Sequence, residues 1–154
     1  MTLKAFFTAL LLGTAAAAAA EDAPTPAADP VFGQVEARDL EQFLWTHRPV
    51  VVFADSPFDP AFTEQMELLR ARPDALAARD VVVLVDTDPA AASALRRTLR
   101  PRGFMLAIVG KDGRVALRKP RPWDVREITR SIDKMPIRQQ EIRREKEAAA
   151  SADG

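Results

Sequence analysis

Three aspartates follow predicted strands, at positions where their carboxylates could act together at one edge of a β-sheet. Asp55 follows an apolar run at residues 49–53. Asp86 and Asp88 follow a second such run at residues 81–85. The carboxyl ends of parallel strands meet at one edge, where open α/β sheets usually bind ligands, and carboxylate oxygens there can hold Mg²⁺ or Ca²⁺. A metal- or phosphate-dependent enzyme is therefore kept as the alternative hypothesis.

A structural role explains part of this acidic group. Asp59 and Asp88 each precede a proline, and an aspartate in that position is a favourable N-cap of a helix. Only Asp55 and Asp86 are then left without a structural role, and both could simply end a strand in water. The capping interpretation needs fewer assumptions, so we expect neither a bound metal nor an organic cofactor.

A second candidate site is basic and lies in the later part of the chain. Residues 21–90 carry 5 basic and 14 acidic side chains, whereas residues 91–154 carry 16 basic and 8 acidic ones. A basic face could bind an acidic protein, an anionic lipid or a glycan. Alternatively, lysines and arginines on an edge strand prevent aggregation, and the sequence leaves both interpretations open. The predicted binding residues are Arg114, Arg118, Lys119, Arg121 and Trp123.

The elements that must position these residues alternate along the chain. Apolar runs rich in β-branched residues predict four strands, at residues 49–53, 81–85, 104–109 and 115–117. Apolar stripes at helical spacing predict helices that begin near Pro60, Pro89 and Val125. A further exposed helix is expected at residues 137–148, where charges of both signs alternate.

The resulting order, β-α-β-α-β-β-α, indicates a three-layer α/β domain with a mixed four-stranded sheet and an extra C-terminal helix. The tight turn at residues 110–113 contains Asp112-Gly113, which favours an antiparallel hairpin of the last two strands. An open flavodoxin-like sheet would need a helix between these strands, and the turn leaves no room for one. The order is that of the thioredoxin fold.

The ends of the chain indicate export. Residues 1–20 contain one lysine, a short apolar run and a tract of alanines, which is the pattern of a secretory signal peptide. Residues 21–35 are rich in proline and alanine and are predicted to be a linker, the domain is expected at residues 36–147, and residues 148–154 are predicted to be a disordered tail. We therefore expect a periplasmic or secreted protein, with no stable membrane span after cleavage and no nucleic-acid partner.

Four segments also carry a resemblance to a known family. They are RPVVVFA at 48–54, RDVVVL at 79–84, VGKDG at 109–113, and IDKMPIR at 132–138 followed by Glu141, Ile142 and Arg143. With these segments the chain resembles the thioredoxin-like family called domain of unknown function 4174, over roughly residues 40–144. The resemblance implies a thioredoxin-like fold in an exported protein, and the family name assigns no reaction.

Thiol chemistry is the usual activity of a thioredoxin fold, yet this chain contains no cysteine. The reactive pair of such enzymes follows the first long strand, where this chain has Ser56 and Asp59 with the same two-residue gap. Gly103 stands before the third strand, where a cis-proline is expected. The lone His47 precedes the first strand rather than following it, so no serine triad forms. We therefore reject a thiol oxidoreductase and expect a non-catalytic binding module whose partner and oligomeric state stay open.

Overall fold

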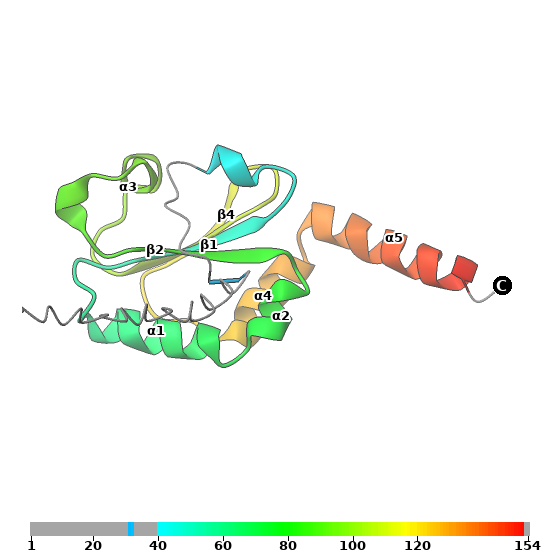
Figure 1. Ribbon diagram of the computed structural model, residues 1–154, viewed down its shortest axis with the longest axis horizontal. Helices are drawn as coiled ribbons and strands as arrows, with labels where there is room; N and C mark the ends of the chain where they lie inside the picture. The colour runs from blue at the N-terminus through cyan, green and yellow to red at the C-terminus, as the bar shows by residue number, and fades with distance from the viewer. Residues whose placement is uncertain (1–30, 33–39, 153–154) are drawn as a thin grey trace, which may run out of the picture.

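The computed structural model describes residues 31–32 and 40–152 (Figure 1). The predicted signal peptide at residues 1–20 lies outside the described residues. Among the described helices, none has the length and apolar character needed to cross a membrane. In chain order the elements are η1 (Glu41–Phe43), β1 (Arg48–Phe53), α1 (Pro60–Arg70), α2 (Pro73–Ala77), β2 (Val81–Asp86), η2 (Pro89–Ala91), α3 (Ala94–Leu99), β3 (Met105–Val109), β4 (Val115–Lys119), α4 (Val125–Asp133) and α5 (Pro136–Ala152).

The four strands form one mixed sheet in the order β2-β1-β3-β4. β1 and β2 are parallel, β3 is antiparallel to β1, and β4 is antiparallel to β3. Every residue of the central strand β1 is buried, as its continuous apolar run predicts. The strand order, the hairpin of β3 and β4 and the additional C-terminal helix confirm the predicted thioredoxin-like fold.

Helices cover both faces of the sheet. α1, α2 and α4 lie on one face, whereas η1 and α3 lie on the other (Figure 1). Successive residues of a strand point to opposite faces, so β1 supplies both cores. Val50 and Val52 pack toward α1 and α4. Val51 and Phe53 pack with the residues of α3.

The helix predicted to begin at Pro89 is divided in two. Asp88 Oδ1 accepts hydrogen bonds from the first backbone N–H groups of η2, the nearer at 3.0 Å, and these cap only that 3-10 turn. Ala92 is left-handed with φ 45° and ends the turn. Ser93 then caps α3 by accepting a hydrogen bond from the N–H of Arg96 at 3.1 Å. The prediction of one continuous helix is wrong because the chain contains a second capping residue.

Two described segments outside the predicted domain at residues 36–147 have regular contacts or structure. Val31 is 2% exposed and belongs to the core on the α1 face. Its carbonyl accepts a hydrogen bond from the N–H of Val83 at 2.7 Å, although the composition of residues 21–35 indicated only a linker. At the other end, α5 includes residues 148–152, which were assigned to a disordered tail. The reason is a run of three alanines, the residue with the highest helix propensity.

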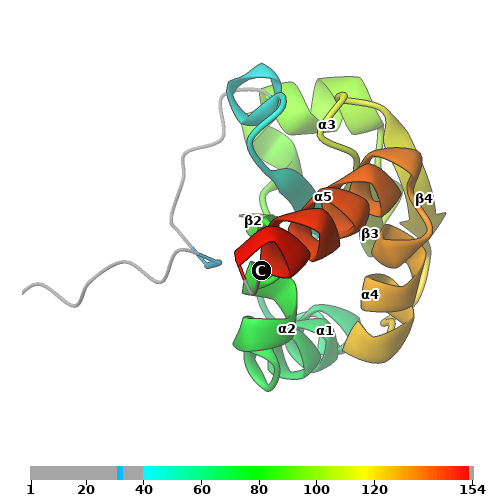
Figure 2. The same ribbon diagram turned by 90° about the vertical axis from the view of Figure 1, so that its right-hand side faces the viewer.

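α5 starts at one end of the sheet and points away from the body of the domain (Figure 1). Figure 2 shows the same helix projecting toward the viewer, with α1 and α2 on one side of it and α3 on the other. Residues 143–152 are exposed, whereas Arg138 is buried and Glu141 is half-buried. The contacts that hold α5 in place therefore come from its first turns.

Candidate functional site

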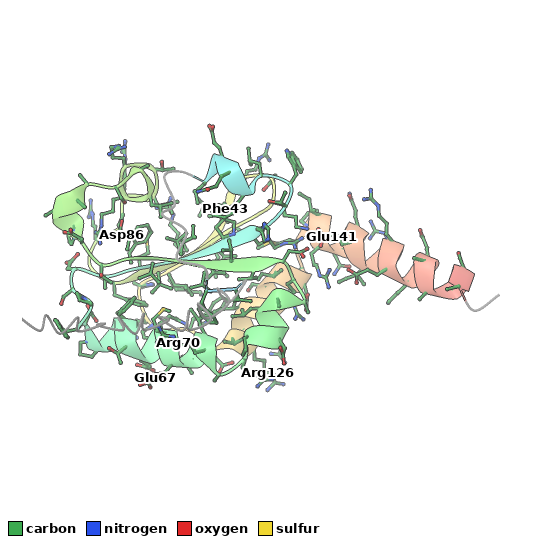
Figure 3. All side chains as sticks on the ribbon, in the orientation of Figure 1. Phe43, Glu67, Arg70, Asp86, Arg126 and Glu141 are labelled. Atoms are coloured by element: carbon green, nitrogen blue, oxygen red, sulfur yellow. The ribbon has the colours of Figure 1, made fainter. Side chains whose placement is uncertain are left out.

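The predicted site residues are distributed over two ends of the sheet, which are marked by Asp86 and Glu141 in Figure 3. The end near Asp86, called the Asp86 end below, consists of the loops at residues 54–59, 87–93, 100–104 and 120–124. These loops meet because β1, β2 and β4 finish there and β3 begins there. The opposite end, called the Glu141 end, contains the β3–β4 hairpin and the start of α5.

Asp86 is bound by side chains of α3 and its capping residue. Arg96 Nε donates a hydrogen bond to Asp86 Oδ1 at 2.7 Å, and the Ser93 hydroxyl donates to Asp86 Oδ2. Arg96 also donates to the carbonyl oxygens of Ala54, at 2.6 Å, and Asp86, at 3.1 Å. The side chains of Arg96 and Asp86 are only 11% and 9% exposed. This pair therefore ties the ends of β1 and β2 to the start of α3.

Arg96 occupies the position beside Asp86 that the metal hypothesis assigns to a divalent cation. Asp55 lies 3.9 Å from Arg96 Nη1, and Asp88 is engaged in capping η2. The guanidinium of Arg96 is a permanent cation, and it already pairs with Asp86, which a divalent ion would need as a ligand. Within residues 31–32 and 40–152, no three His, Cys, Asp or Glu side chains are grouped so that they could hold a metal. Asp86 thus belongs to a buried ion pair and Asp88 to a helix cap, whereas Asp55 is 63% exposed.

Ser56 and Asp59, at the positions of a redox pair, are engaged with nearby backbone. The Ser56 hydroxyl oxygen accepts a hydrogen bond from the N–H of Phe58 at 3.1 Å. Asp59 Oδ1 accepts from the N–H of Ala61 at 2.8 Å and caps α1, as predicted. His47 lies before β1, at the far end of that strand. No cis peptide bond occurs in the described residues, and no nucleophile with an adjacent base is formed at this position.

The five predicted binding residues do not form one surface. Arg114 lies at the Glu141 end, with its side chain 89% exposed. Arg118 and Lys119 are neighbours on β4 and therefore point to opposite faces of the sheet. Arg118 Nη1 donates to the carbonyl of Leu99 in α3 at 2.6 Å. On the other face, Lys119 Nζ lies 4.6 Å from the centroid of the Trp123 ring.

Trp123 has a structural role that the sequence analysis missed. The fully buried Gln65 of α1 accepts a hydrogen bond from the Trp123 N–H at 2.7 Å and donates one to its carbonyl at 3.1 Å. The Trp123 ring is partly buried against the core. Trp123 therefore fixes the loop at residues 120–124 onto α1. In the same loop Arg121 is exposed and has no ion pair with any residue that the structure describes.

Two arginines that the sequence analysis passed over lie beside Arg118. Arg100 and Arg102 line the same pocket as Arg118 and Lys119, and neither forms an ion pair in the described part of the chain. Their location could have been found from the predicted topology, because they flank Pro101 directly before the third strand. The exposed positive charge of the Asp86 end is therefore greater than predicted.

A network of ion pairs at the Glu141 end fastens α5 to the sheet. Arg48, the first residue of β1, is 1% exposed and donates to Glu141 Oε2 at 2.9 Å and to the Arg79 carbonyl at 2.8 Å. Lys111 binds the other oxygen of Glu141 at 2.9 Å and Asp80 Oδ2 at 2.7 Å. A carboxylate on the projecting helix therefore neutralises a buried arginine of the central strand.

The network extends into α4 and the first turns of α5. Arg79 donates to both oxygens of Asp133, at 2.8 and 2.7 Å. Arg138 Nη1 contacts Glu141 at 3.3 Å and Glu145 at 2.9 Å. This network was not predicted from the sequence. All four segments that carry the family resemblance contain charged residues, and this could have indicated it. Those segments and the residue after them contribute Arg48, Arg79, Asp80, Lys111, Asp133, Arg138 and Glu141.

The network is expected to make the stability of the domain sensitive to acid. Burial alone would raise the pKa of Glu141, but hydrogen bonds and charges of Lys111 and Arg48 hold it below the ordinary 4.5. The hydrogen bond from Arg79 is the largest of the effects that lower the pKa of Asp133 below 3.8. When a carboxyl pKa is lowered by folding, the associated stability is present above the unfolded-state pKa and lost as the pH falls through the folded-state pKa.

We therefore expect the free energy of unfolding to fall as the pH decreases below about 5. Urea unfolding followed by circular dichroism across this range measures the slope. Replacing Glu141 by glutamine should make the slope shallower, because that position no longer titrates. An equal slope in the two proteins would contradict the role assigned to Glu141.

The strand order, the crossover and the hairpin define a cysteine-free, thioredoxin-like α/β domain. A sequence model described as "Domain of unknown function (DUF4174)" matches residues 39–141, and the chain belongs to this family. Among solved structures, it is similar to thioredoxin peroxidase I of Plasmodium yoelii, with a TM-score of 0.50 and 14% sequence identity. That match covers 66% of this chain and 79% of the peroxidase chain. A search of curated proteins finds no match.

This likeness is one of fold. At 14% identity it carries no information on the reaction, and without cysteine the chain cannot supply the thiolate that thiol chemistry requires. The position at which a redox pair would stand is occupied by Ser56 and Asp59, both bound to local backbone.

Proposed function

We propose that this protein is a non-catalytic, exported thioredoxin-like module that binds a partner in the cell envelope through the Asp86 end. The observation that carries the proposal is that some polar groups at this end are bound inside the domain, whereas several arginines are exposed and unpaired among the described residues. The carboxylate of Asp86 and the hydroxyl of Ser56 are engaged inside the domain. Arg100, Arg102 and Arg121 are exposed and have no ion pair with the described residues. The carboxylate and hydroxyl groups that could take part in catalysis are thus hydrogen-bonded within the domain, whereas the guanidinium groups that could bind a partner are free within the described part of the chain.

Export is supported by the signal-peptide pattern at residues 1–20. A periplasmic or secreted location fits a partner that is a protein or another anionic envelope component, because guanidinium groups pair most strongly with carboxylates and phosphates. N-terminal sequencing of the mature protein, with fractionation of the cells that make it, tests the location.

Charge reversal at Arg118 and Arg121 tests the binding function. Crosslinking in intact cells is expected to recover a reproducible partner with the native chain. The yield with Arg118→Glu/Arg121→Glu should fall by about tenfold, because two favourable contacts become repulsive. The matched control is Arg143→Glu/Arg144→Glu, which makes the same change of net charge on the exposed part of α5.

Undiminished crosslinking by the Arg118/Arg121 variant, at an unchanged melting temperature, would exclude this end as the docking surface. An equal loss in the Arg143/Arg144 control would also count against it, since attraction would then depend only on net charge. Arg118 also donates to the carbonyl of Leu99, so the single variant Arg121→Glu, which breaks no hydrogen bond of the described residues, is measured in parallel.

A further inference from the structure

The pocket beside Arg118 has the composition of an anion-binding site. It has a volume of about 250 Å³ and lies at the Asp86 end, between the loop before β3 and the last residues of β4. No acidic side chain lines it. The lining residues are Arg100, Arg102, Phe104, Met105, Arg118, Lys119 and Pro120.

The cations of this pocket are unneutralised. Arg100 and Arg102 form no ion pair with any described residue. Arg118 is oriented by donating Nη1 to the Leu99 carbonyl at 2.6 Å, which leaves its other N–H groups free. One carboxylate close to this loop is Asp55, whose Oδ2 would lie 4.0 Å from a Cβ at Gly103. Because Asp55 faces Arg96 at 3.9 Å, it neutralises another cation first.

A pocket at the Glu141 end provides the contrast. It has a volume of about 150 Å³ and is also lined by basic residues, among them Arg48 and Lys111. Both of these are paired with Glu141 at 2.9 Å. Arg48 and Lys111 of the smaller pocket therefore have a carboxylate partner, whereas the arginines of the larger pocket have none among the described residues.

The backbone of the Arg100 loop is strained. Arg100 has φ 51° at the end of α3, in the left-handed region. Glycine is the common residue at such helix ends because a side chain there carries an energetic cost. Strained non-glycine residues tend to occur at binding sites, and here the strained residue places a guanidinium at the rim of the pocket.

The remaining lining indicates what is attached to the anion. Phe104, Met105 and Pro120 contribute an apolar surface next to the three guanidinium groups. Guanidinium groups bind phosphate oxygens in paired hydrogen bonds, and several of them favour a doubly charged anion over a monocarboxylate. We propose that this pocket binds a phosphate monoester whose organic part is small and apolar. The inference deepens the proposed function by naming the chemistry recognised at the Asp86 end, but its test needs no cellular partner.

The test is a calorimetric titration of the purified protein with phenyl phosphate, at constant ionic strength set by sodium chloride. Saturable binding is expected, and inorganic phosphate should bind more weakly because it lacks the apolar part. Arg102→Glu should weaken phenyl phosphate binding at least about tenfold, the value of a lost charge-assisted hydrogen bond. The matched control is Arg114→Glu, an equal change of charge on an 89% exposed side chain at the other end, which should change affinity less than about twofold.

Arg100→Gly separates the loss of the site from damage to the fold. Glycine is favoured at φ 51°, so the melting temperature should stay the same or rise. Phenyl phosphate binding should nevertheless weaken, by less than in Arg102→Glu, because a guanidinium is lost but no repulsive carboxylate is added. Lower affinity together with undiminished stability is a result that a purely structural role of Arg100 does not produce.

Vesicles distinguish the sources of the phosphate monoester. Binding to phosphatidic acid in phosphatidylcholine vesicles, but not to phosphatidylcholine alone, and its loss in Arg102→Glu would assign a lipid headgroup. Binding of phenyl phosphate without binding of either vesicle would assign a free phosphate monoester. Both outcomes support the pocket.

Two outcomes would overturn it. One is that phenyl phosphate shows no saturable binding in the sodium chloride buffer. The other is an equal loss of affinity in Arg102→Glu and Arg114→Glu, which would show that binding depends only on the net charge of the protein. Either result would leave the proposed function standing if crosslinking still depended on Arg121, so the two failures are distinguishable.

Discussion

Replacing Glu141 by alanine is expected to lower the free energy of unfolding by about 3 kcal/mol. Arg48 is 1% exposed and would lose its carboxylate partner at 2.9 Å. The other carboxylate near it, Asp80, lies 3.9 Å away. Removing the close partner of a buried charge is more costly than breaking a surface pair, because water does not replace the lost interaction. Urea unfolding near pH 7, analysed with a common m value, measures the change.

The matched control for this variant is Glu147→Ala. Glu147 lies on the same helix, is exposed and has no ion pair in the described part of the chain. Its loss should change the free energy of unfolding by less than about 0.5 kcal/mol. If the two variants were equally stable, the contact between Glu141 and Arg48 would contribute nothing to the stability of the domain.

Replacing Asp86 by alanine is expected to cost a similar amount, about 3 kcal/mol. The Arg96 side chain, 11% exposed, would keep its hydrogen bonds to backbone carbonyls but lose the carboxylate at 2.7 Å. Ser93 would also lose its acceptor. Because these contacts connect the end of β2 with the start of α3, the loss should be visible as a lower unfolding midpoint at unchanged m value.

Asp55→Ala is the control for Asp86→Ala. Asp55 faces the same arginine, but at 3.9 Å and with a 63% exposed side chain, so its removal should cost less than about 0.5 kcal/mol. A double replacement, Asp86→Ala with Arg96→Met, should recover part of the loss, since it removes the unpaired charge as well. No recovery would show that the cost of Asp86→Ala arises from something other than Arg96.

The same variants separate an ion-pair cluster from a metal site. With Arg96 between the carboxylates, neither Mg²⁺, Ca²⁺ nor EDTA is expected to shift the melting temperature of the native chain. A metal-dependent rise of several degrees that disappears in Asp55→Ala would restore the enzyme hypothesis, because specific binding stabilises the folded state by mass action.

These ion pairs bear on function because they fix both ends of the sheet. Arg96 binds the end of β1 through the Ala54 carbonyl and the end of β2 through Asp86. The buried Gln65 fixes the loop that contains Arg121 and Trp123. A surface whose loops are held in place loses less conformational entropy when a partner binds. The partner proposed for the Asp86 end would therefore meet loops that are already held in place.

Much of the fold could be predicted from neighbouring residues in the sequence. The apolar runs at residues 49–53 and 81–85 are the central strand β1 and the neighbouring edge strand β2. Asp59 caps α1, and the turn at residues 110–113 joins an antiparallel pair. Each of these features depends on interactions between residues a few positions apart, such as capping hydrogen bonds and turn geometry. Neighbouring residues in the sequence are therefore enough to predict them. The lack of cysteine excludes thiol chemistry in the same direct way.

The roles of the charged side chains were decided by the tertiary structure. Arg48 and Glu141 are 93 positions apart, and nothing near either residue indicates the other. Asp86 was read as a free carboxylate because its partner Arg96 reaches it only after the chain turns at Ala92. Whether a charge is buried, paired or free depends on distances between elements remote in the chain. The energy of an ion pair depends strongly on those distances and on access of water, so only the packed structure separates the structural cations from those left free to bind.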